Sequence, residues 1–211
     1  MAVFMSQVLA TARTYLNDDN VTQFPDPVLI PKVQEAHREL QEELWIIGSP
    51  LVRAQTAPLA YVAPAVTLTT ALTGVTDFLC PTALFENASG ATIIQAGWTP
   101  MTESFYIPLG YAMAATLQWW AWAQEVIVLG GATVNRAVIV QYRRQITIPV
   151  VATDPIGILF GESYLSARTA AIAAGTVGNK EVYEAMTALA KENLGKVISA
   201  NRGQQKSSMK P

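Results

Sequence analysis

The sequence predicts a mixed α+β protein, with a four-helix bundle core formed by N- and C-terminal helices, a central β-rich insertion and a β-hairpin. Three observations favour this fold class. Apolar residues recur at helical spacing near both ends, residues 54–135 contain no lysine or arginine, and a glycine pair separates two β-branched runs. We expect a helical body at 1–53 and 145–200, the insertion at 54–144 and a flexible basic tail at 201–211.

Composition limits the class of protein. Hydrophobic residues make up 51% of the chain and charged residues only 14%, against about a quarter in typical soluble domains. So few charges suit a membrane protein or a subunit that buries its surface against others. The uncharged segment between Glu103 and Glu125 is long enough to cross a bilayer, but it contains Pro108 and Gly110 and lacks flanking bases. We predict no membrane span, and the N-terminus without a basic start predicts a cytoplasmic product.

The sequence offers no constellation for catalysis or cofactor binding. Cys80 and His37 are the single residues of their types, which excludes a disulfide framework and a multi-cysteine zinc site. Phosphate-binding, dinucleotide-binding and serine-hydrolase motifs are absent. Asp18 and Asp19 could hold a hard cation, but nothing beside them completes a ligand set, and a solvated turn explains them better. We therefore expect no metal, no cofactor and no enzymatic activity.

Two helices open the chain. The first covers residues 3–16, and its apolar stripe consists of Phe4, Val8, Ala12 and Tyr15. Asp26 is expected to cap the second helix and Pro31 to stand in its first turn, since a proline deeper inside would break it. Gly48 ends this helix. Its apolar stripe consists of Val33, Ala36, Leu40, Leu44 and Ile47. The charged side is interpreted as a solvated surface and includes Glu35, Arg38, Glu39, Glu42 and Glu43.

Strand-like segments fill the insertion and predict a barrel or a sandwich. They are separated by proline and glycine, and they cover 59–62, 66–70, 75–79, 91–96 and 105–107. A hairpin follows, in which Val126–Leu129 and Val134–Tyr142 are joined by Gly130-Gly131. This glycine pair can supply the positive φ angles of a tight turn.

Two further helices form a helical hairpin after the insertion. Asp154-Pro155 is expected to begin the third helix, which carries Phe160 and Tyr164. Its small residues would allow another helix to approach closely, and they are Ala167, Ala170, Ala171 and Ala174. Asn179 is expected to cap the fourth helix.

Two groups of residues are candidates for contacts with other molecules. The tryptophans at positions 119, 120 and 122 could stack on bases or sugars, but no basic residue accompanies them, which favours packing or interface anchors. From Lys191 onward, five basic residues stand against the single acid Glu192. Such a tail could contact nucleic acid phosphates or an acidic protein groove, and a solubilising terminus explains it equally well.

Several different short segments follow one another along the chain, and their order is more informative than any one of them. They are Tyr15-Leu16-Asn17-Asp18, Phe24-Pro25-Asp26, Asp77-Phe78-Leu79, Trp120-x-Trp122, Ile127-Val128-Leu129-Gly130, Val138–Tyr142 and Tyr164–Ala170. Their order and spacing resemble the head-to-tail connector, or adaptor, proteins of tailed bacteriophages. The resemblance covers much of the chain, although no single segment is chemically specific.

The resemblance implies a structural, non-enzymatic component of the virion neck, present in the host cytoplasm during assembly. Members of that family form an oligomeric ring, typically dodecameric, that joins the portal protein to the tail or stopper protein. The ring extends the DNA channel and lets double-stranded DNA pass without sequence-specific binding. On this basis, the candidates for portal binding are Lys196, Arg202, Lys206 and Lys210. The candidates for the subunit interface are Trp119, Trp120 and Trp122. Glu103 and Glu125 are candidates for channel lining, where like charge would keep DNA from sticking.

Other classes of function stay open. A β-rich ligand- or receptor-binding module of a phage tail would use the aromatic residues and the β region. An acid-dependent hydrolase would depend on Asp18 and Asp19, and a membrane-associated protein would partition with lipid.

Overall fold

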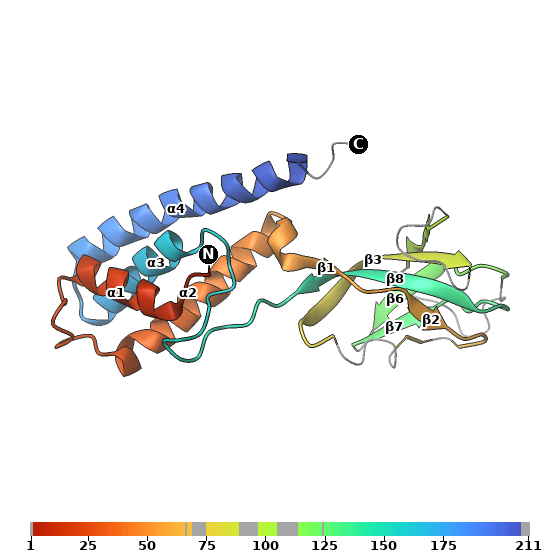
Figure 1. Cartoon of the computed structure of the whole chain (residues 1–211), viewed down its shortest axis with the longest axis horizontal. Coiled ribbons are helices and arrows are strands. Elements are labelled where there is room, and N and C mark those ends of the chain that lie inside the picture. Colours follow the sequence, from red (N-terminus) through yellow and green to blue (C-terminus); the bar gives the residue numbers. More distant parts are fainter. Residues whose placement is uncertain are drawn as a thin grey trace. The chain divides into compact units, whose positions relative to one another are not determined.

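The computed structural model describes residues 2–65, 67–68, 75–88, 97–104, 114–123 and 125–207, with the backbone alone at 88 and 201–207. The chain divides into two units (Figure 1). The helical unit comprises Met1–Val52 and Ile146–Pro211, and the β unit comprises Arg53–Gln145. The predicted mixed α+β class is confirmed, since the described residues form four α-helices and two β-sheets.

The first helix of the helical unit, α1 (Met5–Leu16), begins where the N–H of Phe4 donates to Gln7 Oε1 at 2.9 Å. It ends at Asn17, whose φ of 56° is a left-handed conformation that asparagine tolerates. The buried side of α1 consists of Met5, Val8, Leu9 and Ala12. The predicted stripe is therefore correct at Val8 and Ala12, whereas Phe4 precedes the helix and is 42% exposed.

The second helix, α2 (Asp26–Ile46), begins well before Pro31, so the predicted start is wrong. Pro27 occupies the first turn, where a proline loses no helical hydrogen bond. Pro31 lies inside the helix and removes one bond to the preceding turn. The helix tolerates this loss because buried residues on both sides of Pro31 hold it to the core, namely Leu29, Val33, Ala36, Leu40 and Leu44. It ends before Gly48, which has a φ of 66°, as predicted.

Two predicted features of α2 differ in the structure. Asp26 makes no capping hydrogen bond and instead forms an ion pair with Arg13 of α1. Ile47 lies just past the last helical residue and is 37% exposed, so the buried stripe ends at Leu44. A short 3₁₀ turn, η1 (Pro50–Val52), then leads out of the helical unit.

The third helix, α3 (Glu162–Thr176), begins later than the sequence predicts. Asp154 does not start it, because its Oδ2 accepts the N–H groups of Val150 at 2.8 Å and Val151 at 3.0 Å. These bonds close a turn within the loop. Phe160 also precedes the helix, with a φ of 62°.

The small residues of α3 allow it to pack against α1, α2 and α4 at once. Its fully buried alanines are Ala167, Ala170, Ala171, Ala173 and Ala174. The last helix, α4 (Lys180–Ser207), begins where the N–H of Val182 donates to Asn179 Oδ1 at 3.2 Å. Asn179 is therefore the predicted cap.

α4 continues through residues 201–207, for which the composition predicts a flexible tail. Gly203 is the weakest helix former in this stretch and costs only about 1 kcal/mol relative to alanine. Among the α4 residues whose side chains the structure describes, Val197 is the last that belongs to the core of the helical unit. In the described part of the chain, no helix is long and apolar enough to cross a membrane.

The larger sheet of the β unit is built around β8 (Arg136–Arg144). β8 pairs antiparallel with β3 (Phe78–Ala88) along one edge. Along its other edge it pairs antiparallel with β1 (Arg53–Gln55) and β2 (Leu59–Tyr61). β4 (Thr99–Pro100) extends the sheet beyond β3.

The first and last strands of the β unit are therefore neighbours. Arg53 of β1 lies opposite Arg143 of β8, and Gln55 lies opposite Gln141. The chain therefore enters and leaves the β unit through two strands, β1 and β8, that are hydrogen-bonded to each other.

The smaller sheet corrects the predicted hairpin. Its central strand, β6 (Trp119–Ala123), pairs parallel with β5 (Thr102–Glu103) and antiparallel with β7 (Val126–Leu129). β7 thus turns back onto β6, while β8 lies in the other sheet. The positive φ of this turn belongs to Glu125, at 63°, and not to Gly130-Gly131. β8 pairs with the long strand β3 instead, which offers far more partners than the four residues of β7.

Side chains from both sheets share one core, which is the arrangement of a sandwich. The core residues include Tyr61, Leu84, Trp120, Ile127, Leu129, Val138 and Val140. Arg136 Nε pairs with Glu86 Oε2 at 2.7 Å across β3 and β8, and the Glu86 side chain is only 5% exposed. The predicted strands at 91–96 and 105–107, and most of the one at 66–70, lie outside the described residues.

Candidate functional site

His37 belongs to a buried hydrogen-bond network in the helical unit. Its Nε2 lies 2.8 Å from the carbonyl oxygen of Ile156 and therefore donates, so Nδ1 accepts from Gln41 Nε2 at 2.9 Å. Gln41 also pairs with the backbone C=O and N–H of Ile146, at 2.9 and 2.8 Å. Burial lowers the pKa of His37. The network fixes the returning chain to α2 and occupies both ring nitrogens.

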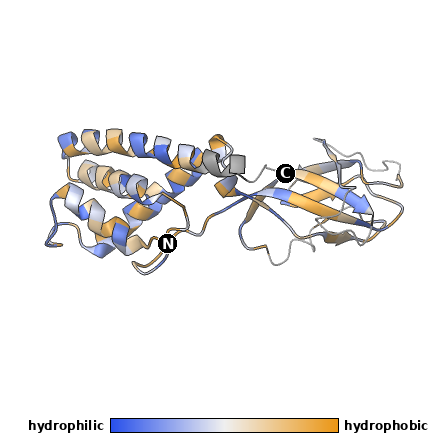
Figure 2. Ribbon diagram, turned by 45° about the horizontal axis from the view of Figure 1, so that its top comes forward, coloured by the Kyte–Doolittle hydropathy of each residue, from blue (hydrophilic) through white to orange (hydrophobic). Residues whose placement is uncertain are grey.

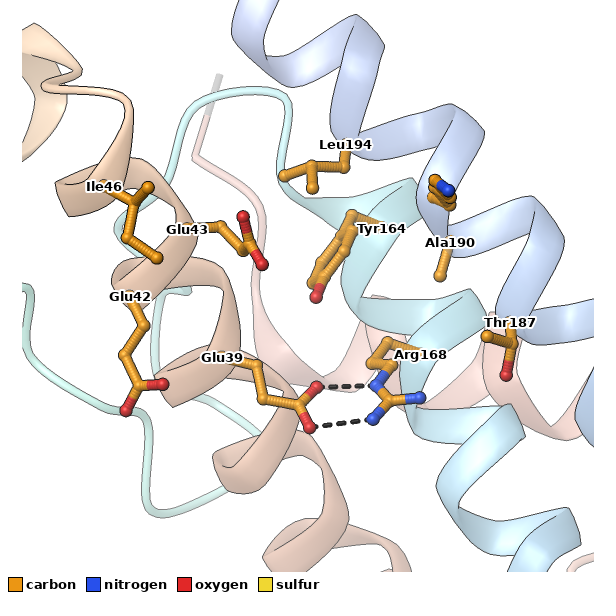
Figure 3. A pocket seen from close by; sticks show the side chains of 10 residues that line it. Glu39, Glu42, Glu43, Ile46, Tyr164, Arg168, Thr187, Ala190 and Leu194 are labelled. Carbon is orange, nitrogen blue, oxygen red and sulfur yellow. Dashed lines mark hydrogen bonds and ion pairs between the residues drawn. The ribbon is translucent and has the colours of Figure 1, made fainter.

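A groove of about 500 Å³ lies between α2, α3 and α4 (Figure 3). We call it the acidic groove. The residues that line it are Glu39, Glu42, Glu43, Ile46, Tyr164, Arg168, Thr187, Ala190, Lys191 and Leu194. Three helices supply these residues, and α2 supplies all three of the acids.

An ion pair closes one side of the acidic groove. Arg168 Nε and Nη2 donate to the two carboxylate oxygens of Glu39 at 2.5 and 2.8 Å. This bidentate geometry raises the pKa of Arg168. Burial, together with the nearby charge of Glu39, raises the pKa of Tyr164 to about 12. The phenol therefore stays protonated at neutral pH and is a hydrogen-bond donor facing the groove.

The rest of the acidic groove is open, and Lys191 is the second basic residue in its lining beside Arg168, against three acids. Glu42 and Glu43 are exposed, and neither forms an ion pair with a described side chain. Ile46, one turn further along α2, is 79% exposed. Thr187 Oγ1 is buried in the groove wall without a hydrogen-bond partner among the described residues. The groove thus combines exposed apolar surface, two free carboxylates and an unused hydroxyl.

A second surface surrounds Phe160, and we call it the Phe160 surface. Two neighbouring cavities, the larger of about 350 Å³, share the residues Val3, Leu159 and Phe160. Leu159 is 41% exposed and Phe160 is 57% exposed. Phe160 adopts its left-handed φ of 62° without being a glycine. Lys196 of α4 lines the larger cavity beside them.

The two surfaces use different side chains of the same two helices, α3 and α4. A helix turns by about 100° per residue, so Leu194 of the acidic groove and Lys196 of the Phe160 surface point about 200° apart on α4. On α3, Tyr164 of the groove and Glu162 of the Phe160 surface are separated in the same way. One helical unit therefore presents two different apolar surfaces in two directions.

No protein-family model and no curated protein matches this chain. The fold and these two surfaces are therefore the basis for a functional assignment.

The three tryptophans predicted at a subunit interface lie in β6. Trp120 is 1% exposed and belongs to the core of the β unit, so its side chain is not available to a neighbour. Trp122 is half-buried and packs on Phe78, with ring centroids 5.6 Å apart. Trp119 is also half-buried. Because successive side chains of a strand point to opposite faces, Trp120 and Trp122 share the face that packs on the core of the β unit, and Trp119 points to the other face.

The charged candidates are spread over the molecule. Glu103 and Glu125 are both exposed but belong to different ends of β6: Glu103 is paired opposite Trp120, and Glu125 follows the far end. Lys196 forms an ion pair with Glu192 at 2.7 Å on α4. The side chains of Arg202, Lys206 and Lys210 lie outside the described residues.

Asp18 holds the turn after α1, and Asp18 and Asp19 have different hydrogen-bond partners. It is 6% exposed and accepts the N–H groups of Thr22, Gln23 and Phe24, besides the Thr22 hydroxyl. Burial alone would raise the pKa of Asp18, but these donors lower it to about 2. Asp19 accepts from Thr14 Oγ1 instead. Among the described residues, no group of three or more potential ligands could hold a metal ion.

Proposed function

We propose that this protein is a structural subunit of a phage neck, an adaptor that forms a ring between the portal and the tail and extends the DNA channel. In this proposal the helical unit is a four-helix bundle that packs side by side with its neighbours. The observation that carries the proposal is the pair of different surfaces that α3 and α4 help to form, each with exposed apolar side chains.

Two unlike surfaces on one subunit favour head-to-tail association. A dimer with two-fold symmetry uses one patch twice, whereas a ring joins one patch to a different patch on the next copy. The acidic groove and the Phe160 surface are such a pair. Burying an apolar side chain the size of Ile46 or Phe160 contributes about 1.5–3 kcal/mol, so each contact in the ring would gain from both.

The backbone at Phe160 supports a role in contacts. A left-handed φ costs a residue with a side chain about 1–2 kcal/mol, and here it holds an aromatic ring in water at 57% exposure. Neither the strain nor the exposure stabilises the free subunit. Strained residues cluster where function requires them, and covering this ring with a neighbour would offset both costs.

The β unit is proposed to contact neighbouring subunits or the tail. Its low charge and its threonine content suit surfaces that become buried, and Glu103 and Glu125 are exposed acids that would repel DNA if they faced a channel. Replacing residues 54–144 by a short linker would test this role. Normal tail attachment by the shortened protein would argue against it.

The experiment for the ring proposal is the molecular mass of the protein by light scattering, alone and mixed with the portal protein of the same phage. Negative-stain images of the complexes would follow. A ring of the protein, either alone or on the portal, is the expected result. A subunit that stays monomeric with the portal present would contradict the proposal and favour the ligand-binding alternative.

Two glycine variants sharpen this experiment. Phe160→Gly removes the strain and the exposed ring, so we expect a free subunit more stable by about 1 kcal/mol that assembles poorly. Val21→Gly is the matched control, because Val21 has a φ of 57° and is 45% exposed but lines neither surface. It should gain stability and assemble normally. Equal assembly of the two variants would remove Phe160 from the interface.

A further inference from the structure

We infer that the acidic groove of one subunit binds the basic C-terminal part of α4 from the neighbouring subunit. The inference rests on the proposed ring and names the contact that would hold it together. Its elements are an acidic, partly apolar receptor, a helical extension with several basic residues, and a geometry that prevents the two from meeting within one chain.

The charges of the helical unit are segregated. Glu39, Glu42 and Glu43 line the groove on α2, Arg168 forms an ion pair with Glu39, and Lys191 is the second basic residue in the lining, so the acids exceed the bases by one. After Glu192 the chain has no acidic residue, whereas Lys196, Arg202 and Lys206 follow at intervals within α4. A net charge of only -2 for the whole protein therefore hides two regions of opposite sign. Opposite charges on two surfaces of one subunit favour head-to-tail contacts between copies.

The last part of α4 extends past the core. Among the α4 residues with described side chains, which end at Ala200, Val197 is the last in the core cluster, and the helix continues to Ser207. Ten further residues extend it by about 15 Å. Docking on another surface would stabilise this part of the helix, since most helical stability in proteins comes from tertiary packing. Figure 2 shows hydrophobic and hydrophilic residues distributed along α4 as far as the coloured part of the ribbon reaches.

The acidic groove suits such a helix in both chemistry and form. Glu42 and Glu43 offer exposed carboxylates to basic side chains, and Ile46 and Leu194 offer apolar contact to residues such as Ile198. In Figure 3, the side chains of Glu42, Glu43 and Ile46 lie on α2 across from Leu194 and Tyr164. The unpartnered Thr187 hydroxyl adds one hydrogen-bonding group to the wall.

The groove of the same chain is out of reach. Ala190 and Leu194, which line it, lie on α4 itself, upstream of the extension. A continuous helix cannot fold back on its own earlier turns. Lys196, where the extension begins, belongs to the Phe160 surface on the side opposite the groove. A neighbour that docks its Phe160 surface therefore brings its basic extension toward the groove.

The test measures binding of a fluorescein-labelled peptide of residues 195–211 to the full-length protein by fluorescence anisotropy. We expect saturable binding that weakens as salt is raised. The double variant Glu42→Lys/Glu43→Lys should lose about tenfold or more in affinity. The control Glu103→Lys/Glu125→Lys carries the same charge change on exposed residues of the β unit and should bind like the wild type.

A charge exchange separates a specific contact from general attraction. A peptide with Arg202→Glu and Lys206→Glu should fail to bind the wild type and should bind the Glu42→Lys/Glu43→Lys protein. Circular dichroism would establish that the variant is folded, which the exposure of both acids favours. Restored binding in this pair supports the inference even if the variant is less stable.

Three results would overturn the inference: no binding at millimolar peptide, equal loss in both double variants, or binding of the peptide to the portal protein but not to the subunit. The last result would instead support the prediction that the basic residues of this segment bind the portal protein. Rings that form normally from the Glu42→Lys/Glu43→Lys protein would also overturn it while leaving the proposed function intact. Groove binding by the peptide without any ring would support the contact and contradict the ring.

Discussion

Replacing Gln41 by methionine should destabilise the helical unit far more than a glutamine on a helix usually does. Gln41 is 2% exposed and holds the backbone of Ile146 with two bonds, besides bonding His37. Methionine has a similar length and no branch, so the substitution removes the polar groups and leaves little cavity. The effect should therefore come from the hydrogen bonds alone.

The magnitude follows from the groups left behind. Ile146 is 7% exposed, so its N–H and C=O would lose their partners in a place that water reaches poorly. Each unsatisfied buried group costs about 1–3 kcal/mol, so the two backbone groups alone predict a loss of about 2–6 kcal/mol, and His37 Nδ1, which also loses its donor, adds to this loss. Since small domains are stable by about 5–15 kcal/mol, the loss should bring the helical unit close to unfolding.

Urea unfolding followed by the helical circular dichroism signal measures this loss. Hydrogen exchange of the Ile146 amide, read by mass spectrometry, locates it. Gln34→Met is the matched control, because Gln34 Nε2 makes a single partly buried bond to the Pro149 carbonyl at 3.1 Å. It should cost about 1 kcal/mol. Equal destabilisation by the two variants, or unchanged protection of Ile146, would refute the proposed role of the network.

Three other perturbations have definite outcomes. The imidazole of His37 should stay neutral when the pH falls below 6.5, the ordinary pKa of histidine, because burial lowers its pKa. His37 is the single histidine of the sequence, so its ring nitrogen signals can be followed by NMR without overlap. A titration centred at 6.5 would contradict this prediction. The pKa of Asp18 is lowered from 3.8 to about 2, so its carboxylate stabilises the fold above pH 3.8 and this contribution disappears as the pH falls toward 2. The difference in unfolding free energy between the wild type and Asp18→Asn should therefore vanish between pH 3.8 and 2. A difference that stays constant over this interval would contradict the prediction. Arg136→Met should destabilise the β unit by about 3–5 kcal/mol because it leaves Glu86 buried without its partner. Lys180→Met is the control, because it breaks an exposed ion pair with Glu184 in which the charged atoms are 3.6 Å apart, and it should change stability by less than about 1 kcal/mol. Similar losses in the two variants would contradict the prediction.

Much of the helical unit could be predicted because its signals are local. The spacing of Val33, Leu40 and Leu44 marks a buried helix face, Gly48 ends that helix, and Asn179 caps the last one. Each of these signals acts within a few residues of the chain. The error at Pro31 arose because tertiary packing on both sides of the proline outweighs one lost hydrogen bond.

The β unit shows where local signals fail. Gly130-Gly131 between two β-branched runs is a good hairpin signal, yet the runs join different sheets. β8 pairs with β3 and not with β7. Glu86 of β3 lies fifty residues before its ion-pair partner Arg136 of β8. A turn signal carries no information on such a distant partner, so the longer and better packed pairing prevailed.

The candidate site was missed for the same reason. Glu39, Glu42 and Glu43 were interpreted as a solvated helix face, which is the usual meaning of such residues. What makes them part of a groove is Arg168, which is 129 residues away in the chain. Phe160 was assigned to a helix stripe because its spacing fits, whereas its backbone turns left-handed just before α3 begins.

The neighbouring positions of β1 and β8 have a consequence for how this protein can change over evolutionary time. Because Arg53 and Arg143 face each other, the two ends of the β unit are close enough to be joined by a short turn. Closing such a short gap costs little chain entropy. Gene rearrangement could therefore exchange this unit for a smaller or larger one while the helices kept their packing.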